Sequence, residues 1–318
     1  MVVAPGRAIR PTDRRDAEEA EVQRTETRDP ACPFCPGNEA ELPGVLMETP
    51  GPTDAGWSFR AVPNRFAGFQ GSTSGTEPAA PARFPRGFQE VLIESPDHLA
   101  DLSTLDERAL QRAVEGYHAR YAAAAGQRSI SRVLLFRNRG RPAGSSLRHP
   151  HAQLVAMELE PPEMARRDAA FRALREELGG QCPLCRPGLI EPDPGQRVVR
   201  ETEHFVCRIP WAAEAPFEVW IVPRRHEPDF RDLAFPEEGG ELAMLLGWVT
   251  RRYAEAAGDP DYNLLVHSAG PRDPDPTPLH WWIRLVPRVG QHAGLELLSG
   301  VRVNPSSPEE GAATLRKP

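Results

Sequence analysis

Short runs of β-branched and aromatic residues, bounded by turn-forming residues, recur along both halves of the 318-residue chain. Runs of this length and composition are typical of β-strands. In the first half the predicted strands are Trp57–Val62, Glu90–Glu94, Arg132–Arg137 and His151–Met157. In the second half they are His204–Ile209, Phe217–Val222, Tyr262–His267 and Trp281–Val286. The pattern therefore predicts a protein rich in sheet, with strands in both halves.

Three longer segments carry apolar residues at helical spacing. The first is predicted to begin at a capping box formed by Ser103 and Asp106. Its apolar stripe consists of Leu110, Val114, Tyr117 and Tyr121. The other two predicted helices are Met164–Leu178 and Glu237–Ala257, each followed by glycine. Four segments rich in Pro, Gly and Ser are predicted to be loops or a tail: 71–86, 186–197, 270–278 and 305–318.

Two similar Cys-x-x-Cys motifs indicate an internal duplication. CPFCPG begins at Cys32 and CPLCRPG begins at Cys182, 150 residues later. RVLLFRNRG before HPHAQLVAM in the first half also resembles YNLLVHSAG before LHWWIRLVP in the second. Similar segments in the same order predict a repeated unit. We therefore expect two copies of one α+β unit, over residues 1–160 and 161–318.

Composition and charge exclude several classes of protein. The net charge is −7, which argues against general binding to nucleic acid or to an anionic membrane. Lys317 is the only lysine, so mechanisms that need a phosphate-binding or Schiff-base lysine are not expected. Neither a GxGxxG fingerprint, a secretory apolar segment after Met1 nor a run of about 18 apolar residues is present. We therefore expect a cytoplasmic protein without a nucleic-acid or membrane partner.

The paired cysteines predict metal sites. Both motifs contain proline and lie in predicted turns, whereas a redox Cys-x-x-Cys usually opens a helix. Zinc takes four Cys or His ligands, of which each motif supplies two. The candidates for the remaining ligands are His98 and His149 in the first half and His226 and His280 in the second, at separations of 51 and 54 residues. We expect two structural zinc sites; buried, reduced thiols without metal are the alternative.

The segment GSSLRHPHAQLVAM, residues 144–157, predicts catalysis at phosphorus. On an extended strand His149, His151 and Gln153 share one face. If zinc binds His149, the neutral imidazole of His151 can act as a nucleophile. Gln153 can donate to a phosphoryl oxygen, and the Gly-Ser-Ser turn offers donors for a second phosphate. Two histidines without a chemical role are the alternative interpretation.

These motifs resemble the galactose-1-phosphate uridylyltransferase branch of the histidine-triad superfamily. The similar segments are HPHAQ with its upstream Cys-x-x-Cys, APGRAIRP, VPNRF, SPDHL, FRNRG and GLELLSG. The resemblance implies an α+β fold of two tandem histidine-triad-like units, with an antiparallel sheet and helices on one face. It also implies a homodimer whose active sites borrow residues from the other subunit.

The resemblance also assigns roles to residues. It implies zinc ligands at Cys32, Cys35, His98 and His149, and a second set, similar to that of two-zinc plant members, at Cys182, Cys185, His226 and His280. It implies His151 as the nucleophile and Gln153 as its catalytic neighbour, where related hydrolases carry a third histidine. The implied substrate-binding residues are Arg7, Arg10, Asn64, Asn138, Gly144, Ser145, Ser146 and Glu296. Trp282 stands at the position of His151 in the second half, so one active site per chain is expected.

The expected activity is transfer of a nucleoside monophosphate from a nucleoside diphosphate sugar to a sugar 1-phosphate, through a covalent nucleotidyl-histidine. One alternative is a nucleotide-sugar or dinucleotide phosphorylase, in which inorganic phosphate is the acceptor. The other is a zinc-stabilised nucleotide-binding protein without turnover. The second half has HWW where the family has HWH, and GLE where the family has GFE. These differences leave the identity of the sugar undetermined.

Overall fold

The computed structural model describes residues 28–51, 56–69, 86–290 and 294–317. Ten strands form one antiparallel sheet in the order β1-β2-β3-β5-β4-β9-β10-β8-β7-β6. The strands are β1 (Met47–Pro50), β2 (Trp57–Pro63), β3 (Gly87–Ile93), β4 (Arg132–Arg139), β5 (His151–Met157), β6 (Val198–Glu201), β7 (Phe205–Arg208), β8 (Val219–Pro223), β9 (Tyr262–His267) and β10 (Trp282–Pro287). All eight predicted strands are confirmed; β1 and β6, the two edge strands, were not predicted.

The order of the strands repeats on either side of the central β4–β9 pair. From the centre outward the first half runs β4, β5, β3, β2, β1, and the second runs β9, β10, β8, β7, β6. Each half also places a long helix between its third and fourth strands, α2 (Glu107–Ala125) or α4 (Glu237–Ala256). This repeated order supports the predicted duplication, while the division into units 1–160 and 161–318 stays a prediction.

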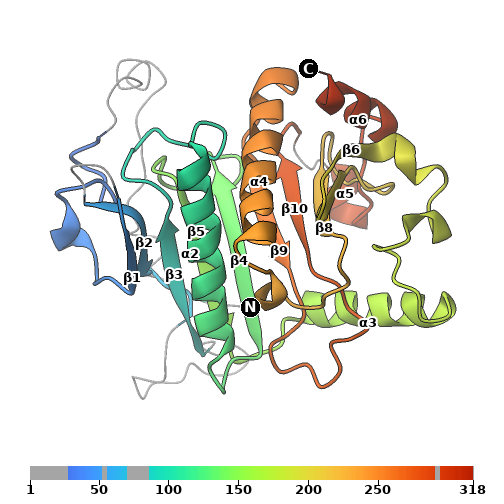
Figure 1. Ribbon diagram of the computed structural model, residues 1–318, viewed down its shortest axis with the longest axis horizontal. Helices are drawn as coiled ribbons and strands as arrows, with labels where there is room; N and C mark the ends of the chain where they lie inside the picture. The colour runs from blue at the N-terminus through green and yellow to red at the C-terminus, as the bar shows by residue number, and fades with distance from the viewer. Residues whose placement is uncertain (1–27, 52–55, 70–85, 291–293, 318) are drawn as a thin grey trace.

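Helices α2 and α4 lie side by side across one face of the sheet (Figure 1). One glycine allows α2 to approach the sheet closely, and another allows α4 to approach α2. An added Cβ at Gly116 of α2 would lie 2.3 Å from the Phe59 ring, and one at Gly247 of α4 would lie 2.5 Å from Leu110 Cδ1. The buried apolar residues of both helices join those of the strands in one core.

The other α-helices of the described residues are α3 (Pro162–Glu177), α5 (Gly294–Ser299) and α6 (Pro308–Arg316). Helix α6 adds Ala312 and Leu315 to the core. Helix α3 runs horizontally at the lower right of Figure 1. It places Phe171 against Trp282 of β10. Short 3₁₀ turns occur at Glu39–Glu41, Pro187–Leu189, Pro194–Arg197 and Phe230–Asp232.

Two local predictions were wrong. Asp106, not Ser103, caps α2, because the Asp106 carboxylate accepts from the Ala109 N–H at 2.7 Å. The segment 305–318, predicted as loop or tail, contains α6, which begins after Ser307 with a proline at its first position. The Ser307 hydroxyl caps this helix by accepting from the Glu310 N–H. Most of 71–86 lies outside the described residues.

The sheet has a core face and an opposite face that carries the candidate chemistry. Ala152, Leu154 and Ala156 of β5 belong to the core beneath the helices. Because side chains alternate along a strand, His151 and Gln153 lie on the opposite face. In the part of the chain that the structure describes, no helix is both long enough and apolar enough to cross a membrane.

Candidate active site and metal centres

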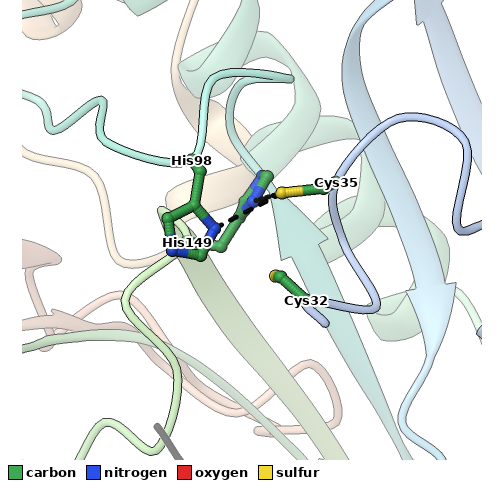
Figure 2. A group of neighbouring side chains, drawn as sticks. All are labelled: Cys32, Cys35, His98 and His149. Carbon is green, nitrogen blue, oxygen red and sulfur yellow. Dashed lines mark hydrogen bonds between the residues drawn. The ribbon is translucent and has the colours of Figure 1, made fainter. Parts of the chain in front are cut away.

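The four predicted ligands of the first zinc site lie together (Figure 2). Cys32 and Cys35 come from the turn before β1, His98 from the loop after β3, and His149 from the residues that lead into β5. Their ligand atoms all lie within 4.8 Å of one another, and all four residues are buried. Cys35 Sγ is 3.3 Å from His98 Nδ1 and 3.5 Å from His149 Nδ1. The cluster could therefore hold a metal ion.

The protonation of this cluster suits zinc. His149 Nε2 lies 2.8 Å from the Ser95 carbonyl, which can only accept, so Nε2 carries the proton and Nδ1 directs its lone pair toward the sulfurs. Burial lowers the pKa of His149 to about 3, so the imidazole is neutral. Burial raises the pKa of the Cys32 and Cys35 thiols, whose thiolates a bound metal would stabilise. Two sulfurs and two imidazoles complete a tetrahedral zinc shell without an open position.

The second predicted ligand set forms a similar but more exposed cluster. Cys182, Cys185, His226 and His280 also place their ligand atoms within 4.8 Å of one another. His280 Nδ1 is 3.4 Å from each sulfur. His226 Nε2 lies 2.9 Å from the Thr277 carbonyl and 2.8 Å from Arg175 Nη1. Cys185 is exposed. The buried Nε2 of His280 has no acceptor among the residues that the structure describes. This donor set also fits zinc.

His151 lies beside the first cluster but is not one of its four residues. Its Nδ1 is 2.7 Å from the His149 carbonyl oxygen, so Nδ1 carries the proton and donates, and Nε2 carries the lone pair. The Phe34 ring, between the two cysteines, packs edge-on against His151 with centroids 5.4 Å apart. The turn that carries the metal ligands and the neighbouring carbonyl thus hold the imidazole in one orientation and one tautomer.

Gln153 and Asn64 are both hydrogen-bonded to Gln89 of β3. Gln89 of β3 donates from Nε2 to Gln153 Oε1 at 3.0 Å, and its own Oε1 accepts from the Gly68 N–H at 3.2 Å. The Gln153 carbonyl is thereby occupied, which orients its NH₂ group as a donor. Asn64, just after β2, pairs its backbone N–H with the Gln89 carbonyl. The predicted Asn64 and Gln153 therefore flank the same residue of β3.

The loop between β4 and β5 carries the other predicted contacts. Gly144 has φ of 91°, a conformation that favours glycine. The Ser145 hydroxyl donates to the Leu147 carbonyl at 2.7 Å, whereas Ser146 is half-buried. Asn138 Oδ1 accepts from Asn263 Nδ2 at 2.7 Å, which links this strand to the second half. The Ser145 proton is thus engaged within the loop, and Ser146 is the better hydroxyl donor for a ligand.

Asn263 is a central residue that sequence reasoning missed. It is 5% exposed, and its Nδ2 also donates to the Ala143 carbonyl at 2.8 Å, which anchors the loop that holds Gly144. The available signal was a polar residue directly before the apolar run Leu264–Val266 of β9. That signal does not reveal the partner, because Asn138 lies 125 residues away in sequence.

A buried ion-pair network supports the other side of the site. Arg137 of β4 donates from Nε to both Glu94 carboxylate oxygens at 2.9 Å, and from Nη2 to Asp101 at 2.8 Å. Its Nη1 donates to the Tyr262 hydroxyl at 3.0 Å. The Glu94 N–H donates to the carbonyl of Pro150, the residue between the two histidines. The network therefore fixes both ends of the loop that carries His98.

One predicted substrate contact, Glu296, lies away from the site, and two others are not described by the structure. Arg7 and Arg10 lie outside the described residues. Glu296 lies on α5, which Figure 1 shows beside β8 and on the far side of the sheet centre from β5. Within one chain Glu296 is therefore separated from His151.

The antiparallel sheet, the two long helices on one face and the repeated strand order define an α+β protein of the histidine-triad type. The family model described as galactose-1-phosphate uridyl transferase, N-terminal domain, matches residues 1–161. The chain belongs to the galactose-1-phosphate uridylyltransferase family, whose members are nucleotidyltransferases. It is an enzyme of this family.

Relatives match along much or all of the chain. An ADP-glucose phosphorylase of Arabidopsis thaliana is 31% identical over 100% of this chain and 89% of its own length. A galactose-1-phosphate uridylyltransferase of Thermotoga maritima is 29% identical over 73% of this chain and 74% of its own. The structure of an Arabidopsis thaliana ADP-glucose phosphorylase with bound ADP-glucose superposes with a TM-score of 0.80 at 30% identity, covering 98% of this chain and 94% of that one.

Proposed function

We propose that this protein transfers a nucleoside monophosphate from a nucleoside diphosphate sugar to a phosphate-bearing acceptor, through a covalent adduct on His151. The supporting observation is the tautomer of His151. Its Nδ1–H donates to the His149 carbonyl, which leaves the lone pair on Nε2, and the ring is not part of the adjacent Cys/His cluster. A neutral, oriented imidazole is a competent nucleophile at neutral pH.

The reaction proceeds by two displacements at the α-phosphorus. His151 Nε2 attacks, a nitrogen–phosphorus bond forms, and the bond from phosphorus to the bridging oxygen breaks. That oxygen takes the electron pair and leaves with the sugar 1-phosphate. An oxygen of the acceptor phosphate then attacks the same phosphorus, the nitrogen–phosphorus bond breaks, and neutral His151 is restored. Gln153 cannot transfer a proton, so it favours a phosphate acceptor, which is already ionised, over water.

Fixed donors stabilise the charge that builds on the phosphoryl oxygens. The Gln153 amide is oriented by Gln89. The loop that leads into β5 offers the Ser146 hydroxyl and the backbone N–H groups near Gly144 as further donors. Arg7, Arg10, Asn64 and Glu296 are further proposed substrate contacts. Glu296 reaches the site from the second subunit of a homodimer.

Zinc, when bound by the two Cys/His clusters, supplies structural support. At the first cluster it would be held by Cys32, Cys35, His98 and His149. Because His149 is both a proposed ligand and the acceptor for His151 Nδ1–H, holding His149 also holds the nucleophile. At the second cluster the ion would be held by Cys182, Cys185, His226 and His280. This half has Trp282 at the position of the proposed nucleophile.

Two acceptors are consistent with this mechanism. A hexose 1-phosphate corresponds to the activity named for the uridylyltransferase relatives. Inorganic phosphate corresponds to the activity named for ADP-glucose phosphorylase, and similarity to that protein along the whole chain favours it. Turnover of ADP-glucose and UDP-glucose, each measured with phosphate and with galactose 1-phosphate, distinguishes the two.

The covalent step is tested directly. The protein is mixed with ADP-glucose or UDP-glucose that carries ³²P at the α-phosphate, quenched in denaturant, and analysed for protein-bound label. We expect up to one adduct per chain, stable in alkali and lost in acid, and none in His151→Ala. His118→Ala, on α2 at the other face of the sheet, is the matched control and keeps the adduct. Tight nucleotide binding without an adduct or product would instead indicate a non-catalytic nucleotide-binding protein.

A further inference from the structure

Arg288 of the second half is joined by hydrogen bonds to the candidate phosphate site of the first half. It follows β10, and its Nε donates to Asn263 Oδ1 at 2.5 Å. Asn263 Nδ2 donates in turn to Asn138 Oδ1 at 2.7 Å and to the Ala143 carbonyl at 2.8 Å. A short relay therefore connects the guanidinium to Asn138 and to the loop that contains Gly144.

The sheet register places this relay next to the nucleophile. Asn138 lies opposite Asn263 in the β4–β9 pair. The β4–β5 pairing ends at Arg137 opposite Ala152, so the next residues in register are Asn138 and His151. Adjacent strands are about 4.8 Å apart. His151, Asn138 and Asn263 therefore form a row across three neighbouring strands, on the face away from α2 and α4.

The charge of Arg288 is not balanced within the described structure. No carboxylate of the described residues lies within 4.0 Å of its guanidinium. By contrast, nearby Arg139 pairs with Asp259 at 2.8 Å, and Arg284 pairs with Glu218 at 2.7 Å. Burial and the neighbouring Arg284 lower the pKa of Arg288, which nevertheless stays protonated as arginines do. Arg288 is exposed, so its guanidinium is accessible to an anion from solvent.

We infer that Arg288 binds the second phosphate of the substrate, that is, the β-phosphate of a nucleoside diphosphate. The inference rests on the proposed function, which places the α-phosphorus at His151. Asn263 occupies Nε, which leaves the two terminal nitrogens as a fork for phosphate oxygens. In a double displacement the acceptor phosphate later takes the place of the leaving one, so Arg288 serves both steps.

The test compares nucleoside diphosphates with monophosphates. Calorimetry with ADP and AMP, and with UDP and UMP, is performed in a His151→Ala background so that no ligand is turned over. Arg288→Gln should weaken diphosphate binding about tenfold or more, the effect of losing a charged hydrogen bond, and monophosphate binding less than twofold. Arg288→Lys should restore part of the loss. Arg224→Gln, an exposed arginine elsewhere in the second half, is the matched control and should change neither.

The outcomes separate this inference from the proposed function. If Arg288→Gln and Arg288→Lys weaken both classes of nucleotide equally, or neither, the assignment of Arg288 is wrong. The covalent adduct on intact His151 is measured independently. Its absence would overturn the proposed mechanism even where Arg288 discriminates between diphosphates and monophosphates.

Discussion

The two halves of the molecule share one strand order but differ in the first residue of one strand. β5 begins at His151 and β10 begins at Trp282, each two residues after a candidate metal ligand, His149 or His280. An indole offers no lone pair to attack phosphorus. The candidate metal cluster and the proposed nucleophile are therefore separable, since the second half has the first without the second.

In the second half, the position that corresponds to His151 is occupied by Trp282, whose side chain is packed among other rings. Trp282 stacks on His267, with ring centroids 4.4 Å apart and planes 6° apart, and Phe171 of α3 stacks on it at 6.5 Å. Trp282, at the position that corresponds to His151, thus belongs to a small apolar cluster with Cys182 and Val222. In the first half the same face carries Gln153 and Asn138, which are polar.

The largest expected effect comes from the nucleophile. His151→Ala should lower the rate of nucleotidyl exchange by about three orders of magnitude or more, because it removes the attacking atom. Trp282→His should not create a second adduct, because α3 covers that position. Steady-state rates and adduct stoichiometry check both variants. A double variant, Trp282→His with His151→Ala, that regained adduct would contradict the difference between the halves.

The two clusters should differ in how fast they release metal. Cys185 is exposed, whereas all four residues of the first cluster are buried. Treatment of the zinc-loaded protein with a chromogenic chelator should therefore release metal in two phases. Cys185→Ala should remove the fast phase, and Cys35→Ala the slow phase along with several kcal/mol of the free energy of unfolding. One uniform phase, or the reverse assignment, would contradict the comparison.

Acid should destabilise the protein through His267 of the second half, whose Nε2 atom is buried. Burial, with Arg167 and Arg284 nearby, lowers the pKa of His267 from 6.5 to about 3. Between these values the unfolded chain binds a proton that the folded chain does not. The free energy of unfolding should therefore fall with decreasing pH, by about 1 kcal/mol per pH unit from this group. His267→Gln can still accept from Arg167, and urea unfolding at several pH values should show a shallower slope than wild type.

The smallest effects come from the two close-packed helices. Gly116→Ala should destabilise the protein by about 1–3 kcal/mol, because the added methyl group meets the buried Phe59 ring. Gly247→Ala should cost less, because it meets the end of the flexible Leu110 side chain. Thermal unfolding of both variants measures the difference. Equal losses would show that the helices shift together instead of yielding at one side chain.

Much of the candidate site could be predicted because its residues belong to short local sequence motifs. Cys-x-x-Cys turns, a strand that alternates His151 and Gln153 with small apolar residues, and matching histidines in each half require no knowledge of distant contacts. Both predicted ligand sets do lie together. The edge strands β1 and β6 were missed because four residues carry too little periodicity to predict a strand.

The sequence by itself determined the main strands and helices, the two candidate ligand sets and the family. The tertiary structure alone decided the tautomers of His149 and His151, because each depends on which carbonyl oxygen faces one ring nitrogen. It also decided the relay from Arg288 through Asn263 to Asn138, whose members come from both halves. The sequence does not show which hydrogen-bond partners will meet when they are far apart in the chain, because their contact depends on how the strands pair in the sheet.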